Sequence, residues 1–335
     1  MALVYKSYEY AMGRIRSIEK KMLTRAQLDR MVDSRSPDDA LRILAEAEYG
    51  SAGDDPEAAR DYEILLDNEN GKLIGLIKEL SPEPALITIF LLKYDYHNIK
   101  VLLKGEFSGN TDDSILSGMG NIPISILKTA MLERKFKDFA KEMIDGIEAS
   151  VDAFNRTSDP QVVDIILDKA LYRHMLREAN AVGNEFLTGL INSYIDIANI
   201  STFVRARAMK KSWEFLRDVL LEGGLITLDV YRENYQESLE SFISALFNTP
   251  YDELCEEGLK SYQLAGNLTV FERKADDYIN DYIKKSKLLS AGMETLISYL
   301  VAKQAEIKNA RVIMVGKKNS IPEEIIRERL RNTYV

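Results

Sequence analysis

Cysteine is nearly absent from this chain: Cys255 is the only one among 335 residues. A single cysteine excludes an internal disulfide framework and is typical of proteins that stay in a reducing compartment, so we expect a cytoplasmic location. Cys255 follows the acidic residues Asp252 and Glu253, whose charges disfavour the thiolate. The sequence therefore predicts no reactive thiol.

Histidine and phosphate-binding glycine motifs are also scarce. The two histidines, His97 and His174, stand far apart, and neither has the spacing of a metal ligand. We expect His97 to be an ordinary, partly packed helical residue. Gly71-Lys72 and Gly316-Lys317 lack the upstream glycine of a phosphate-binding loop. The sequence predicts no catalytic residue, no metal ion and no cofactor.

Long hydrophobic runs are missing as well. The longest, residues 85–92, is far shorter than the about 20 residues that a membrane-spanning helix needs. The first residues do not resemble a signal peptide. A net charge of −9 argues against a general nucleic-acid-binding protein. Hydrophobic residues make up 46% of the chain, which is enough for sizeable cores in two or three domains or repeats.

What the sequence does contain is helical periodicity along most of its length. The segment Thr24-Arg-Ala-Gln27 predicts a capping box, and Ser36-Pro37 predicts a second helix start. Long helices are predicted for residues 57–80 and 87–103, and a polar loop for residues 105–121. Because no stretch alternates in the manner of a strand, the predicted fold is all-α.

One short pattern recurs three times: an acidic residue, two further residues, then asparagine, within an apolar helical run. The three copies are Asp95 to Asn98, Asp196 to Asn199, and Glu306 to Asn309. The asparagines lie about one hundred residues apart, which predicts a chain built from three copies of one helical module.

The recurrence suggests boundaries for the modules. We expect helical repeats at residues 1–95, 96–195 and 196–305, followed by the truncated start of a fourth repeat at residues 306–335. In this tail, Ser320 is expected to cap a helix that includes Glu323. We also expect the tail to pack with the first repeat.

The repeated asparagines, Asn98, Asn199 and Asn309, have two interpretations. Asparagine is a weak helix former, because its side chain competes for backbone groups. Its presence at one place in three helices favours a structural task, in which the amide satisfies a buried backbone group of a neighbouring segment. Contact with a ligand is the alternative that we consider less favoured.

Basic residues gather after each of these patterns and at the equivalent place near the amino terminus. Those that we consider for a partner interface are Arg14, Arg16, Lys104, Arg205, Arg207, Lys210, Lys211, Arg311, Lys317 and Lys318. One interpretation is favourable placement of cations toward helix carboxyl ends. The other is that the clusters come together and face a partner or membrane headgroups.

Four pairs of adjacent aspartates raise the possibility of an enzyme. They are Asp38-Asp39, Asp54-Asp55, Asp112-Asp113 and Asp276-Asp277. An all-α enzyme that binds a Mg²⁺-diphosphate substrate uses such acids, but none of these pairs has the further acidic residues that such a site needs. We interpret the pairs as helix caps or solvated charges.

Several ordered motifs near both ends of the chain resemble one family. At the amino-terminal end they are Tyr8-Glu-Tyr10-Ala-Met-Gly13-Arg14-Ile-Arg16, Leu23-Thr24, and the helix from Asp39 through Leu44 to Tyr49-Gly50. At the other end they are Phe271-Glu-Arg273, Tyr299-Leu300, Lys303 to Arg311, Ile321 to Arg327, and Tyr334-Val335. This order is similar to that of the C subunits of bacterial and archaeal V/A-type ATPases, the counterparts of the d subunits in eukaryotic V-type ATPases.

The resemblance implies a funnel of three similar helical domains around a pseudo-threefold axis. It implies a non-catalytic rotor subunit at the cytoplasmic face of the membrane, present once per complex. Its partners would be the central shaft, made of the D and F subunits, and the membrane proteolipid ring. We expect the loops at residues 105–121 and 221–228 to contribute to one end of the funnel. A generic helical repeat scaffold unrelated to ATPases is the alternative.

Overall fold

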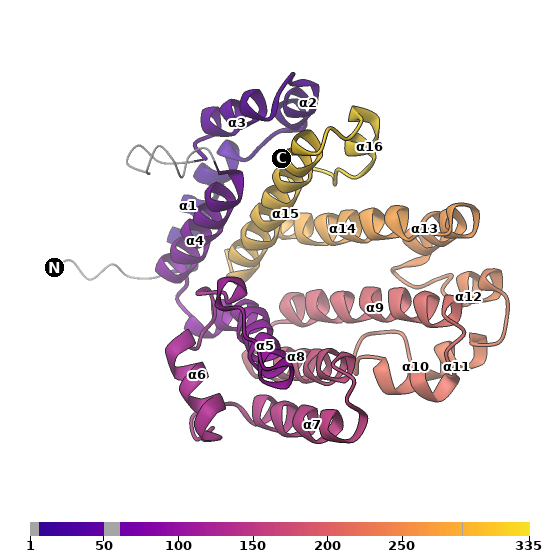
Figure 1. Ribbon diagram of the computed structural model, residues 1–335. Coiled ribbons are helices and arrows are strands. Elements are labelled where there is room, and N and C mark those ends of the chain that lie inside the picture. Colours follow the sequence, from indigo (N-terminus) through magenta and orange to yellow (C-terminus); the bar gives the residue numbers. More distant parts are fainter. Residues whose placement is uncertain (1–6, 50–60, 290) are drawn as a thin grey trace. The chain divides into compact units, whose positions relative to one another are not determined.

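The computed structural model describes residues 7–49, 61–289 and 291–335 (Figure 1). These residues form helices, turns and loops without any strand among them, so the all-α prediction is confirmed. The chain divides into two compact units. The first unit combines both ends of the chain, Met1–Pro84 and Leu246–Val335, and the second is Ala85–Ala245. None of the described helices is long and apolar enough to cross a bilayer.

The first unit is built around its longest helix, α15. The helices of this unit are α1 (Tyr8–Ile18), η1 (Glu19–Lys21), α2 (Arg25–Asp33), α3 (Pro37–Glu46), α4 (Tyr62–Leu80), α13 (Asp252–Ala265), α14 (Thr269–Lys284), η4 (Lys285–Leu288), α15 (Met293–Lys318) and α16 (Glu323–Glu328). Buried residues occur on all sides of α15, which is typical of a helix enclosed by others. Helices α1 to α4, α14 and α16 all pack against it.

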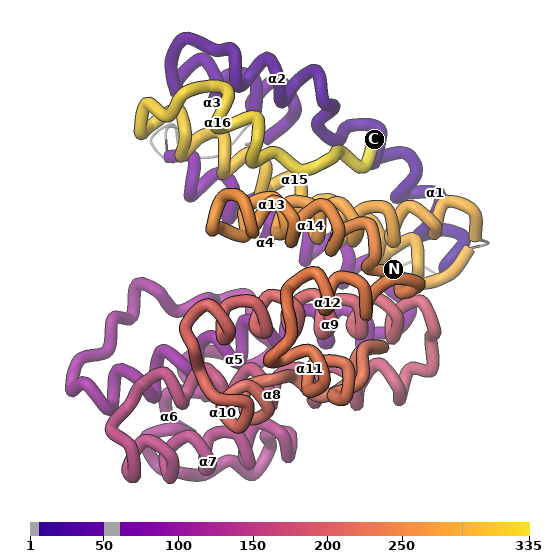
Figure 2. Tube along the Cα trace, turned by 90° about the vertical axis from the view of Figure 1, so that its right-hand side faces the viewer, coloured from indigo at the N-terminus to yellow at the C-terminus, as the bar shows by residue number. Residues whose placement is uncertain are grey.

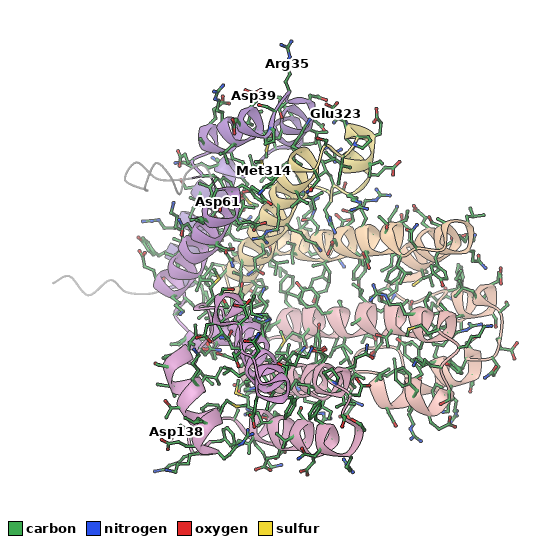
Figure 3. The ribbon with its side chains drawn as sticks, viewed as in Figure 1. Arg35, Asp39, Asp61, Asp138, Met314 and Glu323 are labelled. Atoms are coloured by element: carbon green, nitrogen blue, oxygen red, sulfur yellow. The ribbon has the colours of Figure 1, made fainter. Side chains whose placement is uncertain are left out.

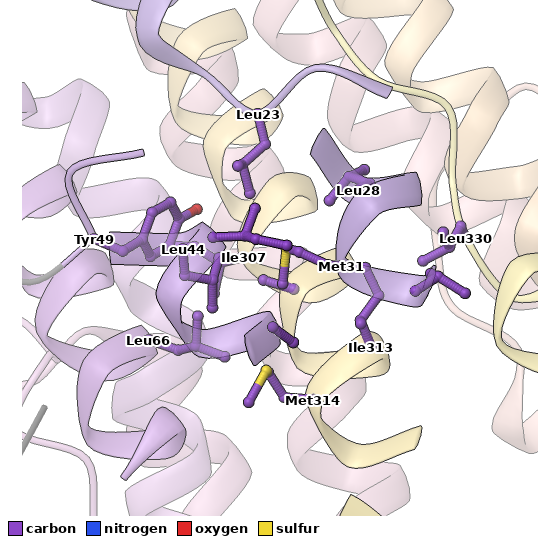
Figure 4. Close-up of a cluster of buried hydrophobic side chains, with 14 of the residues drawn as sticks. Leu23, Leu28, Met31, Leu44, Tyr49, Leu66, Ile307, Ile313, Met314 and Leu330 are labelled. Atoms are coloured by element: carbon purple, nitrogen blue, oxygen red, sulfur yellow. The ribbon is translucent and has the colours of Figure 1, made fainter. Parts of the chain in front are cut away.

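The core of the first unit joins the two ends of the chain. Leu28, Met31 and Leu44 from the amino-terminal helices pack with Ile313 and Met314 of α15 (Figure 4). Helix α16 packs against α2, and the two lie side by side at the top of Figure 1; Figure 2 shows the same region from the side. The carboxy-terminal tail therefore packs with the first segment, as the sequence predicts.

Ion pairs reinforce this junction between the two ends. Arg327 of α16 pairs with Asp29 at 2.7 Å, and it also pairs with Asp33. These groups are partly exposed, so the pairs orient the tail more than they stabilise it.

Local signals set most of the helix starts. Thr24 forms the predicted capping box, and Ser36 caps α3 by accepting from the backbone N–H of Asp39. Asp61 caps α4, whose predicted first residues, 57–60, lie outside the described part of the chain (Figure 3). The expected Ser320 cap is wrong: Ser320 adopts a left-handed conformation, and α16 begins after Pro322 without a side-chain cap.

The second unit carries two of the three asparagine patterns. Its helices are α5 (Pro84–Ser108), η3 (Asp113–Ile115), α6 (Ile124–Glu133), α7 (Lys141–Thr157), α8 (Gln161–Val182), α9 (Glu185–Ala208), α10 (Trp213–Val219), α11 (Leu228–Asn234) and α12 (Leu239–Ala245). Helix α8 packs against both α7 and α9. Helix α5 continues to Ser108, so the polar loop starts slightly later than predicted.

Candidate functional site

The first asparagine pattern holds the loop between α5 and α6, residues 109–123, which we call the first anchored loop. The Asn98 Nδ2 group donates to the Ser117 carbonyl at 2.8 Å, and the Ser117 N–H donates to Asn98 Oδ1 at 2.8 Å. Asp95 accepts the Ile122 N–H at 2.9 Å and the Asn121 amide at 2.8 Å. The acid and the asparagine thus fix two points of one loop.

His97, on the same turn of α5, adds a third point. Its Nε2 atom lies 2.9 Å from the Ile115 carbonyl, and because a carbonyl only accepts, the imidazole N–H donates. His97 is exposed rather than partly packed. His97 therefore lies against the first anchored loop and holds it through this hydrogen bond.

The second pattern repeats this arrangement on the loop between α10 and α11, residues 220–227, the second anchored loop. Asn199 Nδ2 donates to the Leu221 carbonyl at 3.0 Å, and the Leu221 N–H donates to Asn199 Oδ1 at 2.8 Å. Asp196 accepts the backbone N–H groups of Leu225 at 2.7 Å and Ile226 at 3.1 Å. Backbone groups that are partly or fully buried are thereby satisfied in both loops.

A glycine allows each loop to approach its carboxylate. A Cβ added to Gly120 would overlap a carboxylate oxygen of Asp95, and one added to Gly224 would overlap a carboxylate oxygen of Asp196. Gly224 also has a φ of +85°, a conformation that side chains disfavour. In both loops the glycine lies immediately before the residues that bond to the aspartate.

The third pattern, on α15, acts in the first unit on residues 329–335, the carboxy-terminal segment. Asn309 Nδ2 donates to the Arg331 carbonyl at 3.1 Å, and the Arg331 N–H donates to Asn309 Oδ1 at 3.0 Å. The acid of this pattern, Glu306, does not bond to the segment. Asp277 of α14 accepts the Asn332 N–H at 2.7 Å instead.

Asn280, one turn after Asp277 on α14, also holds this segment: its side-chain amide donates to the carbonyls of Asn332 and Thr333. Asp277 to Asn280 therefore has the same acid-to-asparagine spacing, on a neighbouring helix. Two helices hold the carboxy-terminal segment where a single helix holds each anchored loop.

Glu306 belongs to a buried charged cluster that joins both ends of the chain. It accepts the Leu23 N–H at 2.6 Å and the Tyr49 hydroxyl at 2.5 Å. Lys303 pairs with Glu306 at 2.6 Å and with Glu69 at 2.9 Å, and its side chain is only 8% exposed. We call Tyr49, Glu69, Lys303 and Glu306 the buried charge cluster.

Burial and neighbouring charges raise the pKa values of two groups in this cluster, Lys303 and Tyr49. Burial disfavours the Lys303 ammonium, but the carboxylates of Glu306 and Glu69 outweigh burial and raise the pKa of Lys303 above its usual value. Burial, followed by the charge of Glu306, raises the pKa of the Tyr49 phenol well above its usual value. Both groups therefore keep their protons to high pH.

The anchoring aspartates are also affected by burial. Burial raises the pKa of Asp95, and the donors at Ile122 and Asn121 oppose that rise. Burial likewise raises the pKa of Asp277, opposed first by the Asn332 N–H. The hydrogen bonds from the loops thus offset part of the desolvation cost that burial imposes on each carboxylate.

The basic residues considered for an interface have varied surroundings. In the first unit, Arg311 pairs with Glu63 at 2.9 Å, and Lys317 donates to the Ser34 carbonyl at 2.7 Å. Lys318 lies over the Tyr62 ring at 5.5 Å. These three residues connect α15 to the amino-terminal segment rather than forming one outward cluster.

On α1, the two predicted arginines have local partners. Arg14 is exposed and donates to the Tyr10 hydroxyl at 3.4 Å. Arg16 pairs with Glu19 at 3.1 Å.

In the second unit, some basic residues near the end of α9 hydrogen-bond to the backbone, and others are exposed. Arg207 donates to the carbonyls of Asn234 and Glu237, which makes it part of the fold. Lys210 and Lys211 are exposed, and Lys211 lies over the Phe215 ring at 5.1 Å.

Two further predicted cations lie near this region. Lys104 pairs with Asp164 at 2.5 Å. Arg205 lines a cavity of about 420 Å³ between α8, α9 and α10, together with Tyr172, Met209, Phe215 and Leu221. The cavity thus reaches the residue that Asn199 holds.

The other candidate residues show ordinary structural contacts. Burial raises the pKa of Cys255 to about 12, so its thiol stays protonated. His174 is buried, with the Tyr96 hydroxyl 3.4 Å from Nδ1. Within the described ranges, no three His, Cys, Asp or Glu residues are grouped closely enough to hold a metal ion.

The acidic pairs divide among several roles. Asp38 and Asp39 lie in the first turn of α3, and Asp112 caps η3. Asp276 pairs with Arg331 at 2.7 Å. The pair at residues 54–55 lies outside the described residues.

Sequence reasoning missed the residues that complete the anchors. Asp277 and Asn280 repeat the spacing of the recurring pattern, but Asp67 with Asn70 and Asp152 with Asn155 do so as well, so the spacing alone does not single them out. Gly120 and Gly224 were detectable only as glycines in polar loops. The partners of Glu306 had no sequence signal, because Leu23 lies 283 residues away.

Comparison with known proteins gives one consistent result. The family model described as ATP synthase (C/AC39) subunit matches residues 11–329. The C subunit of the V-type sodium ATPase of Enterococcus hirae is 28% identical over 320 residues, covering 96% of this chain and 97% of that protein. The C subunit of the A-type ATP synthase of Methanocaldococcus jannaschii is 27% identical over 352 residues, covering 97% and 86%. That of Pyrococcus abyssi is 23% identical over 336 residues, covering 97% and 90%.

The family match extends over nearly the whole chain, and the ordered motifs at both ends fall within or beside it. It excludes the alternative of a repeat scaffold unrelated to ATPases. The chain belongs to the ATP synthase (C/AC39) subunit family, that is, to the C subunits of V/A-type ATPases.

Proposed function

We propose that this chain is a non-catalytic central-stalk rotor subunit of a V/A-type ATPase. It connects the central shaft, made of the D and F subunits, to the membrane proteolipid ring, so that ATP hydrolysis or synthesis is linked to proton or sodium transport. The observation that carries the proposal is the family match over residues 11–329. The subunit lies at the cytoplasmic face of the membrane, one copy per complex, and reaches the membrane through the ring.

A torque-transmitting adaptor must resist deformation, and the interior of the chain is suited to that task. Helix α15 is buried on all sides, and the buried charge cluster ties it to α4 and to Tyr49. Partners in such a cluster are costly to separate, because each would leave an uncompensated charge in the interior. The two ends of the chain therefore move together.

The anchored loops are the surfaces that we assign to partners. Each loop displays an apolar side chain while its backbone is held by buried polar groups: Ile115 is 53% exposed and Leu225 is 60% exposed. A loop fixed in this way loses little conformational entropy when a partner binds. Together with Arg205 and the cavity between α8, α9 and α10, the second anchored loop offers apolar contact with a cationic edge.

The repeat organisation is part of the same proposal. Three modules, at residues 1–95, 96–195 and 196–305, with the tail at 306–335, are arranged around a pseudo-threefold axis as a funnel. The matching hydrogen bonds of Asn98, Asn199 and Asn309 support it, since each amide holds one backbone residue that follows 19 or 22 positions later. Ser36 and Ser238 also cap their helices through the same offset of three residues.

An affinity pull-down from membranes tests the rotor role. Tagged full-length chain should recover the proteolipid ring and both shaft subunits. Leu225→Asp should reduce recovery of at least one partner, whereas Leu264→Asp, at a leucine 92% exposed on α13, should not. Recovery of neither partner by the parent chain would refute the proposal, and metal-dependent turnover of a diphosphate by the isolated chain would favour the enzyme interpretation.

A further inference from the structure

The connection between α14 and α15 combines cations with exposed leucines. Residues 284–289 have the sequence Lys-Lys-Ser-Lys-Leu-Leu, and we call them the Lys-Leu turn. Leu288 is 89% exposed and Leu289 is 47% exposed. Single exposed leucines are common, but two adjacent leucines beside three lysines form an amphipathic patch.

The backbone of the Lys-Leu turn is held from below. Ser286 is buried, and the Ser298 hydroxyl donates to the Ile283 carbonyl at 3.0 Å. Lys287 lies over the Tyr334 ring at 4.0 Å and donates to the Tyr334 carbonyl at 3.2 Å. The leucines therefore project from a fixed turn and cannot turn inward without breaking these contacts.

The charge around the leucines is mainly positive. Lys285 is exposed, and its Nζ atom lies 5.4 Å from the centre of the Tyr282 ring. Lys284 lies 3.6 Å from Asp281, an exposed pair of little strength. Arg16 and Glu19, which pair with each other on neighbouring α1 and η1, are also within electrostatic reach of Lys287. Lys285, and Lys284 beyond its weak surface pair, are thus available to attract anions, whereas Lys287 is engaged by Tyr334.

We propose that the Lys-Leu turn is a direct contact with the membrane surface, where its lysines meet anionic phospholipid headgroups and Leu288 enters the boundary of the acyl region. Lysines bind the negative surface potential, and apolar side chains beside them gain by leaving water. An acidic protein would satisfy the lysines, but it would need a pocket for two protruding leucines. A headgroup layer receives both without one.

This contact goes beyond the rotor role, in which the ring alone holds the subunit at the membrane. A single cationic and apolar patch gives weak, reversible binding, so the turn acts as a second attachment point. Each lysine near an anionic surface contributes about fivefold to partitioning. The contact should therefore weaken as salt rises.

Vesicle flotation of the isolated full-length chain tests the contact without ring or shaft. One set of vesicles contains phosphatidylglycerol and phosphatidylcholine, and the other contains phosphatidylcholine alone. The parent chain should float with the anionic set only. Leu288→Ser with Leu289→Ser should lower partitioning about tenfold or more, and Lys284→Gln with Lys285→Gln about 25-fold.

Leu264→Ser is the matched control, because Leu264 is as exposed as Leu288 but has no run of lysines beside it; Lys260, one turn away, pairs with Glu256. It should float like the parent, and all variants should keep the parent's circular dichroism. Absence of flotation with anionic vesicles, or equal flotation by the Lys-Leu variants, would overturn the proposal. Binding to a polyglutamate peptide without flotation would also overturn it and assign the patch to an acidic protein.

Discussion

Asn199 and Leu221 exchange two hydrogen bonds, one in each direction, at 3.0 and 2.8 Å. A side-chain amide satisfies both backbone groups of a residue in a loop, as a neighbouring strand would. Ser117 has the same relationship with Asn98, and Arg331 with Asn309. The asparagines thus give irregular segments some of the order of secondary structure.

Replacing Asn199 with alanine should release the second anchored loop. The N–H and carbonyl of Leu221 lose their partners, at a cost of about 2–4 kcal/mol for two partly buried groups. Asn199→Asp keeps the acceptor for the Leu221 N–H but places a carboxylate oxygen opposite the Leu221 carbonyl in a buried position, so it should also destabilise the loop at neutral pH. Hydrogen exchange at the Leu221 amide and urea unfolding measure both effects. Asn155→Ala, on an exposed position of α7, should change stability by less than about 0.5 kcal/mol; equal effects of the two alanine variants would argue against the anchor.

Gly224→Ala should be more damaging than its size suggests. The new Cβ would overlap the Asp196 carboxylate, and the alanine would have to adopt a φ of +85°. We expect the free energy of unfolding to fall by about 2–4 kcal/mol, because of this strain and because the carboxylate acceptor is displaced. Gly118→Ala is the control, because Gly118 has open space around its missing Cβ and no positive φ. Thermal unfolding compares the two, and a tolerated Gly224→Ala would mean that Asp196 does not hold the loop.

Lys303→Met should destabilise the first unit by about 3–5 kcal/mol. The substitution leaves the carboxylates of Glu69 and Glu306 buried without their cation. Lys308→Met removes a lysine from the same helix, but its pair with Asp276 is half exposed and should contribute less than about 1 kcal/mol. Urea unfolding of both variants gives the comparison. Similar losses would show that the cluster is no stronger than a surface pair.

The buried charge cluster should make the first unit sensitive to alkali. The pKa of Tyr49 and that of Lys303 are both raised in the folded state, so the unfolded chain releases these protons at lower pH. Their contributions are complete below the ordinary values of about 10 and are lost as pH rises above them. Unfolding by urea at increasing pH should show this fall.

Tyr49→Phe removes one of the two protons from this linkage. The variant should be less stable near neutral pH, because Glu306 loses a donor, and its stability should fall less steeply above about pH 10. A pH profile parallel to that of the parent would contradict the assignment of Tyr49 to the linkage.

In the proposed rotor role, reversing charges at the end of α9 should weaken assembly with the shaft or ring. Arg205→Glu with Lys210→Glu changes exposed cations beside the cavity and the second anchored loop. Arg207 is left unchanged, because it holds the carbonyls of Asn234 and Glu237. Buried complementary charges set orientation and affinity at interfaces, so we expect recovery of a partner to weaken by about tenfold or more.

The double variant Lys137→Glu with Lys260→Glu makes the same change of net charge at other exposed positions. It should recover the same partners as the parent chain. Loss of assembly in both double variants would point to a general effect of net charge rather than to an interface at α9.

Local signals in the sequence were sufficient for most of the secondary structure. The capping box at Thr24 and the cap at Ser36 depend on groups three residues apart, so spacing alone predicts them. The predicted cap at Ser320 was wrong because α15 is followed there by a residue in the left-handed conformation. That conformation depends on how α16 packs back onto α15, which spacing alone does not predict. The absence of alternating strands was enough to predict an all-α fold.

The sequence by itself determined the helices, the recurrence of an acid and an asparagine three positions apart, and the family resemblance, because these are properties of neighbouring residues and their order. Only the tertiary structure decided what those side chains hold. Asn199 meets a loop of its own unit, whereas Glu306 turns to Leu23 and Tyr49, and Asp277 takes over at the carboxy-terminal segment. Spacing along a helix fixes which side chains share a face, but packing between distant segments selects the partner that each face meets.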